Sequence, residues 1–313
     1  MIKKVLLVIA ALGISVQSSA RAENSLTVML DWFVNPDHAT LVVAQEAGLF
    51  EKAGLVVDLI EPADPNDPPK LVAAKNADLA VSYQPQLHIQ VAEDLPVIRV
   101  ATLIATPLSS LVVLQDGPIE SLADLKGKKV GYSVGGFEDA LLGTMLAAAD
   151  LTLDDIELVN VNFSLSPSLI SGQVDAVIGA YRNFELNQMD IVDVPGRAFY
   201  PEEFGVPAYD ELIIIAHPDN ANDDDIQKFV HVLEQAAQFL VNRPAESWEL
   251  FIKAYPRLND ELNKRAWRDT INRFALRPGA VDGHRYERFA DFLEDRELID
   301  DAKDVEDYAI DVR

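Results

Sequence analysis

The chain has 313 residues, of which 51 are acidic and 26 are basic, so its formal net charge is −25, and it contains no cysteine. No basic stripe is present to displace counterions from phosphates, which argues against nucleic acid as a partner. The absence of cysteine excludes both a disulfide framework and a lipid-modified cysteine at a mature N-terminus.

The first 22 residues have the pattern of a cleaved secretory signal. Lys3 and Lys4 precede an apolar run from Val5 to Val16, and Ala20-Arg21-Ala22 is a small-x-small cleavage site before Glu23. The run is shorter than the ~18 apolar residues that a membrane helix needs. We therefore expect export to a periplasm and a mature chain that is not membrane-embedded. Cleavage removes three cations and no acid, leaving 23 basic and 51 acidic residues and a net charge of −28.

Short apolar runs then alternate with helical patterns, which is typical of parallel strands joined by crossover helices. Strands are predicted at 26–31, 55–60, 78–82, 97–103, 109–114, 129–132, 156–161, 174–179 and 211–216. Helices are predicted between them at 37–49, 67–75, 84–93, 137–149, 166–172 and 181–188. Beyond residue 222 only helices are predicted, at 223–242, 245–254, 260–275 and 284–298. The expected fold class is therefore α/β with a helical C-terminal region.

An internal repeat indicates two lobes. VAAKNADLAVSY, residues 72–83, resembles LISGQVDAVIGA, residues 169–180. Each segment predicts a short helix, a turn with an acid (Asp78 or Asp175) and an apolar strand, and we interpret both acids as turn or cap residues. The 291 residues after the signal exceed a typical single domain, which also favours two lobes.

We expect lobe 1 to comprise residues 23–108 and 210–313, and lobe 2 to comprise residues 109–209. In open parallel sheets, ligands bind beyond the carboxyl ends of the strands. Three segments of this chain occupy that position, namely 31–38, 82–85 and 181–185.

Aromatic and carboxylate side chains gather at these strand ends. Trp32, Tyr83 and Tyr181 offer flat surfaces that suit a planar ring, although periodicity alone is equally consistent with Trp32 in a lobe core. Asp31 and Glu185 are able to accept hydrogen bonds from an exocyclic amine, and each needs a partner if it is buried.

Polar residues after Trp32 have two interpretations each. Asp37 either faces a ligand or caps the helix predicted at 37–49, and the same doubt applies to Asn35. His38 is either a ligand contact or a hydrogen-bonded histidine of the core.

Catalytic signatures are scarce. The chain has no P-loop, glycine-rich nucleotide loop, HExxH pair or GxSxG elbow, and its five histidines lack ligand spacing. We therefore predict no catalytic residue, no metal site and no cofactor. Gly135-Gly136 precedes a helix whose free N–H groups would suit an anion, yet Glu138 and Asp139 in its first turn satisfy the helix dipole and repel phosphate.

Several segments together resemble periplasmic substrate-binding proteins of ABC importers. They are the signal, LDWFVNPDHATLVVAQEAGLFEKAGL, SYQPQ, SLADLKGKKVGY, SGQVDAVIG and YDELIIIA. The most similar branch delivers pyrimidine precursors of thiamine and is related to the fungal pyrimidine synthase of thiamine biosynthesis. The resemblance covers residues 25–220 and is strongest at 30–39, 82–86 and 181–185.

This resemblance implies a two-lobed type II periplasmic binding protein fold that clamps the ligand between its lobes. Ring stacking is expected from Trp32 and Tyr83. Polar recognition of the amino group is expected from Asp31 and Glu185. The remaining expected cleft residues are Asn35, His38, Tyr181 and Asn183.

Two departures separate this chain from the synthase. The region from Phe204 to Leu212, which is comparable to the synthase's cysteine-rich segment, has no cysteine, and the segment 135–139 replaces a phosphate grip that includes a lysine. We therefore expect a monomeric binding protein that has an ABC permease as its partner and is no enzyme. Its expected ligand is an unphosphorylated hydroxymethyl-, aminomethyl- or formylaminomethyl-aminopyrimidine. The alternatives are riboflavin, or a nitrate or sulfonate oxyanion, for which Arg182 is the one obvious basic cleft residue.

Overall fold

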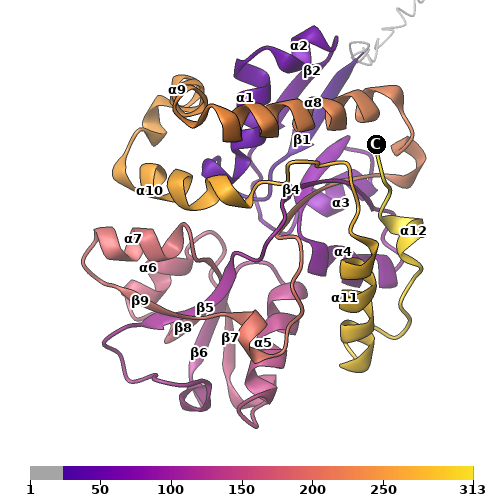
Figure 1. Ribbon diagram of the computed structural model, residues 1–313. Helices are drawn as coiled ribbons and strands as arrows, with labels where there is room; N and C mark the ends of the chain where they lie inside the picture. Colours follow the sequence, from indigo (N-terminus) through magenta and orange to yellow (C-terminus); the bar gives the residue numbers. More distant parts are fainter. Residues whose placement is uncertain (1–23, 313) are drawn as a thin grey trace, which may run out of the picture.

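The computed structural model describes residues 24–312, which form two five-stranded sheets (Figure 1). The predicted signal at 1–22 lies outside the described residues. The first sheet has the order β2-β1-β3-β10-β4 and belongs to lobe 1. Its strands are β1 (Ser25–Met29), β2 (Val56–Ile60), β3 (Leu79–Ser82), β4 (Ile98–Ile104) and β10 (Leu212–Ala216). The second sheet, β7-β6-β8-β5-β9, belongs to lobe 2. Its strands are β5 (Ser109–Leu114), β6 (Lys129–Tyr132), β7 (Glu157–Asn160), β8 (Ala176–Tyr181) and β9 (Gly196–Phe199).

The two sheets share one topology, as the internal repeat predicts. In each, three parallel strands are followed by one antiparallel strand, which is β10 in lobe 1 and β5 in lobe 2. Asp78 Oδ2 accepts a hydrogen bond from Thr27 N at 2.7 Å, and Asp175 Oδ2 accepts one from Lys129 N at 2.9 Å. Both acids therefore bond to the backbone of the neighbouring strand.

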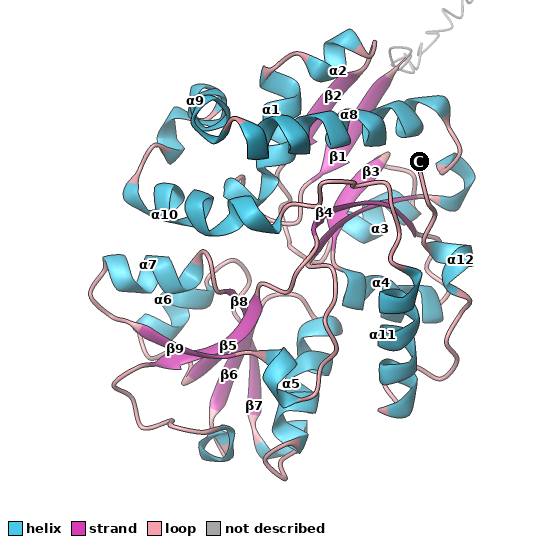
Figure 2. Ribbon diagram, in the orientation of Figure 1, coloured by secondary structure: helices cyan, strands magenta, loops and turns pink. Residues whose placement is uncertain are grey.

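Helices cover both sheets (Figure 2). In lobe 1 they are α1 (Ala39–Glu46), α2 (Leu49–Lys52), α3 (Pro68–Ala73), α4 (Gln84–Ala92), α8 (Asp224–Asn242), α9 (Pro244–Ala254), α10 (Glu261–Thr270), α11 (Gly283–Asp295) and α12 (Val305–Tyr308). In lobe 2 they are α5 (Phe137–Ala147), α6 (Leu165–Ile170) and α7 (Glu185–Ile191). The largest buried apolar cluster lies mainly in lobe 1 and extends to Val134, Phe137 and Leu141 of lobe 2, and two smaller clusters pack on the faces of the lobe 2 sheet. The α/β class with a helical C-terminal region is confirmed.

The chain crosses between the sheets twice, once from β4 to β5 and once from β9 to β10 (Figure 1). Glu211 in the second crossing accepts hydrogen bonds from the backbone of the first, with Ser109 N at 2.9 Å from Oε2 and Leu108 N beside it. The two crossings are therefore bonded to each other. The lobe boundaries at 108/109 and 209/210 stay a prediction.

A buried arginine fixes the C-terminal segment to lobe 1. Arg99 on β4 is fully buried and donates to the carbonyl oxygens of Pro278, Gly279, Ala280 and Ile310. Backbone carbonyls can satisfy a guanidinium because it has five donors in a fixed fork. These hydrogen bonds keep the segment after α10 against the sheet.

Some elements differ from the sequence prediction. The helix predicted at 37–49 is a 3-10 turn, Pro36–His38, followed by α1, which ends at Glu46. The helix predicted at 181–188 begins only at Glu185, because Tyr181 still pairs with Ser109 in the sheet. The helix predicted at 260–275 ends at Thr270 and continues as a short 3-10 turn. Strand β9 had no prediction, since all four of its residues are half-buried and form no apolar run.

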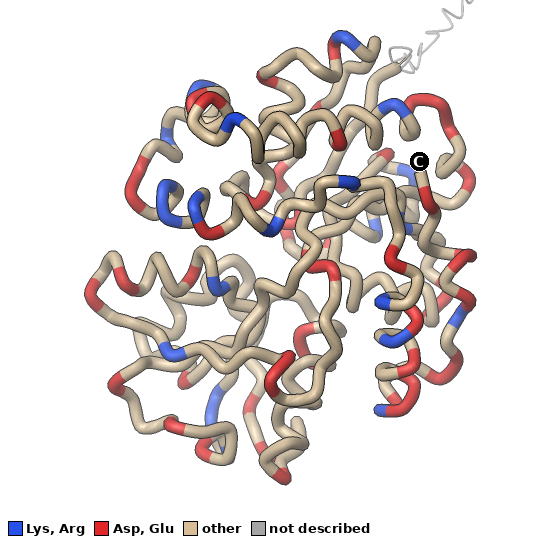
Figure 3. Tube along the Cα trace, viewed as in Figure 1, with Lys and Arg blue, Asp and Glu red and all other residues tan. Residues whose placement is uncertain are grey.

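Acidic residues occur throughout both lobes (Figure 3). Within residues 24–312, no helix is long and apolar enough to cross a membrane.

Candidate ligand-binding site

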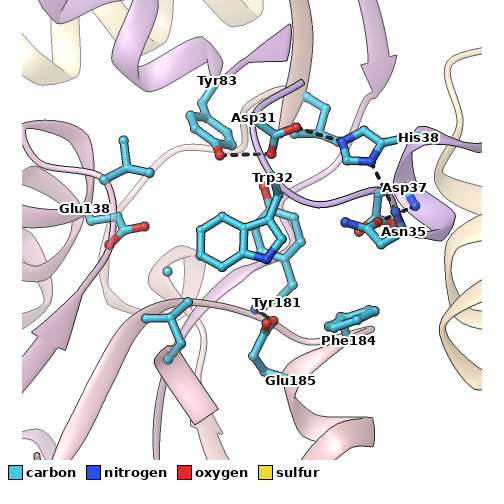
Figure 4. A pocket seen from close by; sticks show the side chains of 14 residues that line it. Asp31, Trp32, Asn35, Asp37, His38, Tyr83, Glu138, Tyr181, Phe184 and Glu185 are labelled. Carbon is cyan, nitrogen blue, oxygen red and sulfur yellow. Dashed lines mark hydrogen bonds and ion pairs between the residues drawn. The ribbon is translucent and has the colours of Figure 1, made fainter. Parts of the chain in front are cut away.

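A narrow cavity lies between the two lobes at the carboxyl ends of β1, β3 and β8 (Figure 4). Lobe 1 contributes Asp31, Trp32, Asn35, Asp37, His38, Tyr83 and Leu212, and lobe 2 contributes Val134, Glu138, Leu165, Gly179, Tyr181, Phe184 and Glu185. Seven of the eight predicted site residues line this cavity, and the exception is Asn183.

Asp31 is held by two protein donors directly after β1. Its Oδ1 lies 2.8 Å from His38 Nε2, and its Oδ2 accepts from the Tyr83 hydroxyl at 2.9 Å. His38 Nδ1 accepts from Asn35 N at 3.3 Å, so the ring proton that Asp31 receives is on Nε2. This chain of bonds fixes the carboxylate, the imidazole and the phenol at one end of the cavity (Figure 4).

The cap of the turn after Trp32 is Asn35 and not Asp37. Asn35 Oδ1 accepts from Asp37 N at 2.8 Å and begins the 3-10 turn Pro36–His38. The capping interpretation of Asp37 is therefore wrong. Its Oδ1 instead lies 2.7 Å from Asn183 Nδ2 and 2.8 Å from Thr270 Oγ1.

Asn183 joins the lobes beside the cavity. It follows β8 in lobe 2, yet its amide nitrogen donates to Asp37 and Thr270 in lobe 1. Asn183 was expected to line the cleft. It instead lies in a contact between the lobes and is not part of the cavity lining. Thr270 was not predicted as a site residue, because it lies in the C-terminal helical region, for which the analysis of the sequence predicted none.

Trp32 is half-buried and projects into the cavity (Figure 4). The ring of Phe163, from the loop before α6 in lobe 2, packs edge-on against it with 4.7 Å between ring centroids and an interplanar angle of 75°. Phe163 also contacts Phe33 at 4.6 Å. Such an edge-to-face pair stabilises one orientation of the indole, and the two rings come from different lobes.

Tyr83 and Tyr181 both lie in the cavity wall. The ring of Tyr83 stacks on Phe137 of α5 at 4.7 Å. The Tyr181 hydroxyl is buried and has no hydrogen-bond partner among residues 24–312. Burial raises the pKa of the Tyr181 phenol well above its usual value, so this hydroxyl is a neutral group open to a ligand.

Glu185 begins α7 and bonds back to the strand before it. Its Oε2 accepts from Tyr181 N at 2.7 Å, which is why β8 ends and the helix begins there. Burial raises the pKa of Glu185 to about 7, and the hydrogen bond from the Tyr181 backbone only partly opposes this effect. The carboxyl is therefore poised between its charged and neutral forms near neutral pH.

The loop before α5 has its backbone N–H groups occupied by the protein itself. Ser133 N donates to Glu138 Oε2 at 2.8 Å, Gly135 N donates to Asn66 Oδ1 at 3.0 Å, and Gly136 N donates to Asp139 Oδ2 at 3.2 Å. Asn66 belongs to lobe 1, and its Nδ2 also donates to Ser133 O at 3.1 Å. The loop is thus bonded to lobe 1 at the position where an anion would need free donors.

Glu138 is a cavity residue that the sequence analysis did not identify as one. It is buried, and burial raises its pKa well above the usual value. Gly179 makes room for it, because a Cβ at that position would overlap the Glu138 carboxyl group. In the sequence, Glu138 stood out only as one of two acids after Gly135-Gly136, and both acids were interpreted as residues that satisfy the helix dipole.

Two α/β lobes of one topology, joined by two crossings and enclosing a cavity at their strand ends, define a periplasmic binding protein fold. A search of solved structures agrees. The alkanesulfonate-binding protein SsuA from Xanthomonas axonopodis pv. citri superimposes with a TM-score of 0.71 at 17% identity, over 92% of this chain and 98% of the other.

The model of the family described as NMT1/THI5 like matches residues 35–247, and the chain therefore belongs to this family. The chain is 53% identical over 302 residues to a "Putative thiamine biosynthesis protein" of Haemophilus influenzae, with 96% of each chain covered. It is 33% identical to the "Formylaminopyrimidine-binding protein" of Halalkalibacterium halodurans, over 79% of this chain and 76% of the relative.

A more distant relative carries the name of an enzyme. The "4-amino-5-hydroxymethyl-2-methylpyrimidine phosphate synthase" of Aspergillus parasiticus is 26% identical over 80% of this chain and 77% of its own. The suspected resemblance to thiamine-related binding proteins and their synthase relatives is thus confirmed at the level of the family.

Proposed function

We propose that this protein is a periplasmic binding protein that captures an unphosphorylated aminopyrimidine precursor of thiamine between its lobes and delivers it to an ABC importer. The observation that carries this proposal is one cavity lined by Trp32, Tyr83 and Tyr181 together with carboxyl groups at both ends. Aromatic faces suit the ring, and carboxylates suit its exocyclic amine because a charge-assisted hydrogen bond is stronger than a neutral one.

The lining argues against an oxyanion ligand. Among the described residues that line the cavity there is neither lysine nor arginine. Arg182 bonds to Glu202 at 2.6 Å and to the carbonyl oxygens of Leu108 and Ser109, and it lies over the Tyr200 ring at 4.1 Å. The Arg182 guanidinium is therefore bonded at the crossings between the lobes. A nitrate or sulfonate in the cavity would meet carboxyl groups, with no lysine or arginine among the described lining residues beside it.

A phosphate on the ligand is disfavoured for a related reason. Helix N-termini bind phosphate through free N–H groups, and the loop before α5 bonds these groups to Glu138, Asp139 and Asn66. This supports the unphosphorylated form of the pyrimidine.

We also propose that the protein binds its ligand without converting it. The region from Phe204 to Leu212 has no cysteine, and residues 24–312 hold no group of three or more metal-ligating side chains. We expect no pyrimidine to form when the protein is incubated with iron, histidine and pyridoxal phosphate, and chromatographic detection of such a product would contradict the proposal.

Export, a permease partner and a monomeric state complete the proposal. Native mass spectrometry of the protein purified from the periplasm of its host tests several points at once. We expect a mass that begins at Glu23, a single chain and one bound aminopyrimidine. A chain that retains residues 1–22 would overturn the localisation, and bound riboflavin or an oxyanion would overturn the ligand.

A further inference from the structure

The cavity contains an unbalanced set of acids. Asp31, Asp37, Glu138 and Glu185 all line it, and the described lining includes no lysine or arginine. Each of the four is at most 8% exposed. Buried carboxylates are costly unless they are paired or fully hydrogen-bonded, so the partner of each one indicates what the cavity still lacks.

Three of the acids are bonded within the protein. Asp31 uses both oxygens, with His38 and Tyr83 as partners. Glu138 and Glu185 accept backbone N–H groups, and burial raises the pKa of each, which favours their neutral forms. Each of these three carboxyl groups therefore has hydrogen-bond donors within the protein.

Asp37 is different. Its Oδ1 accepts from Asn183 and Thr270, but its Oδ2 is buried and has no hydrogen-bond partner in the described part of the chain. The Oδ1 of Asn183, whose amide bonds to Asp37, also lacks a partner within residues 24–312. Burial raises the pKa of Asp37 to about 6, and the hydrogen bond from Thr270 only partly opposes this effect. At pH 7 most of this carboxyl is still ionised, so one negative charge in the cavity has no cation beside it.

We propose that the bound ligand carries a primary ammonium group that pairs with Asp37, so that the aminomethyl form of the pyrimidine is preferred over the hydroxymethyl and formylaminomethyl forms. This inference rests on the proposed function. An ammonium group has three donors and no acceptor, which suits a carboxylate oxygen that lacks donors. A hydroxymethyl group brings one donor without charge, and a formylamino group also brings a carbonyl oxygen that carboxylates repel. The net charge of −25 on the whole chain attracts a cation as well.

Calorimetric titration with the three synthetic pyrimidines at pH 7 tests the inference. Asp37→Asn is the informative variant, because asparagine keeps an Oδ1 acceptor for Asn183 and Thr270 but removes the charge. Asp269→Asn is the matched control. Asp269 Oδ2 accepts from Asn187 of lobe 2 at 2.8 Å at the same lobe interface, yet Asp269 does not line the cavity. Thermal melts check that both variants are folded.

We expect the wild type to bind the aminomethyl form at least tenfold more tightly than either other form. Asp37→Asn should reduce this preference to less than threefold, and Asp269→Asn should retain it. Equal affinity for the three forms, tighter binding of a neutral form, or a preference that survives in folded Asp37→Asn would overturn the inference and leave the proposed function standing. Failure of all three pyrimidines to bind the wild type would instead defeat the proposed function, and this inference with it.

Discussion

Replacing Trp32 with alanine removes the largest flat surface of the cavity. The indole projects between the lobes and is held edge-on by Phe163, with 4.7 Å between the ring centroids. Stacking of a base on an aromatic side chain contributes about 1–3 kcal/mol. Since 1.4 kcal/mol is about tenfold in affinity, Trp32→Ala should weaken pyrimidine binding roughly 5- to 150-fold.

The same geometry predicts a smaller effect for Phe163→Leu. Loss of an edge-to-face pair is about 0.5–1.5 kcal/mol, so affinity should fall roughly 2- to 12-fold although Phe163 itself lies outside the cavity lining. Calorimetric titration of ligand-free protein measures both effects. Trp248→Phe is the control, because Trp248 packs on Trp267 in the helical region, away from the cavity. Affinity of Trp32→Ala within twofold of the wild type would refute the assignment of the stacking surface.

Three further outcomes follow from the structure. Burial raises the pKa of Glu185 from 4.5 to about 7, so the folded protein binds this proton more tightly than the unfolded chain, and the associated stability is lost as the pH rises from about 4.5 through 7. Thermal melts should therefore show a stability that decreases over this range and a flatter profile in Glu185→Gln; parallel profiles would count against the pKa shift. Gly179→Ala should destabilise by about 2–4 kcal/mol in denaturant titrations, because the new Cβ meets the fixed Glu138 carboxyl and the residue has φ +86°. Gly172→Ala, with φ +74° and open space around it, should cost less, and equal losses would show that the clash is absent. Finally, Asn66→Ala removes hydrogen bonds between the lobes, so small-angle scattering should show a larger radius than wild type without ligand and compaction when ligand is added; identical profiles in all states would contradict lobe closure.

Most of the fold followed from local patterns. A buried strand such as β10 is a continuous apolar run, and proline and glycine punctuate the C-terminal helices, so the positions of these elements are encoded in a few neighbouring residues. The start of α7 was not encoded in this way. It depends on Glu185, which accepts a hydrogen bond from Tyr181 N, and the helix begins four residues later than helical periodicity indicated. Strand β9 forms by pairing with β5. Its residues are half-buried and form no apolar run, so no local pattern predicts this pairing.

Site residues that follow the ends of parallel strands could be predicted from the sequence, whereas side-chain contacts between the lobes could not. The strand-end rule brought Asp31, Trp32 and Tyr83 together because each follows a parallel strand of the same sheet. The role of Asp37 depends on Asn183 and Thr270, which are 146 and 233 positions away in the sequence. No local pattern links residues so far apart, so capping was the natural interpretation for an acid beside a proline. Its ligand contact, like that of the other candidate residues, stays a prediction.

Titration of ligand-free protein with 4-amino-5-hydroxymethyl-2-methylpyrimidine, its aminomethyl and formylaminomethyl analogues, riboflavin and an alkanesulfonate tests the central claim most directly. We predict saturable binding of one aminopyrimidine per chain, with weaker or no binding of riboflavin and the sulfonate. Saturation by the sulfonate or by riboflavin, with no heat from any of the three pyrimidines, would contradict it.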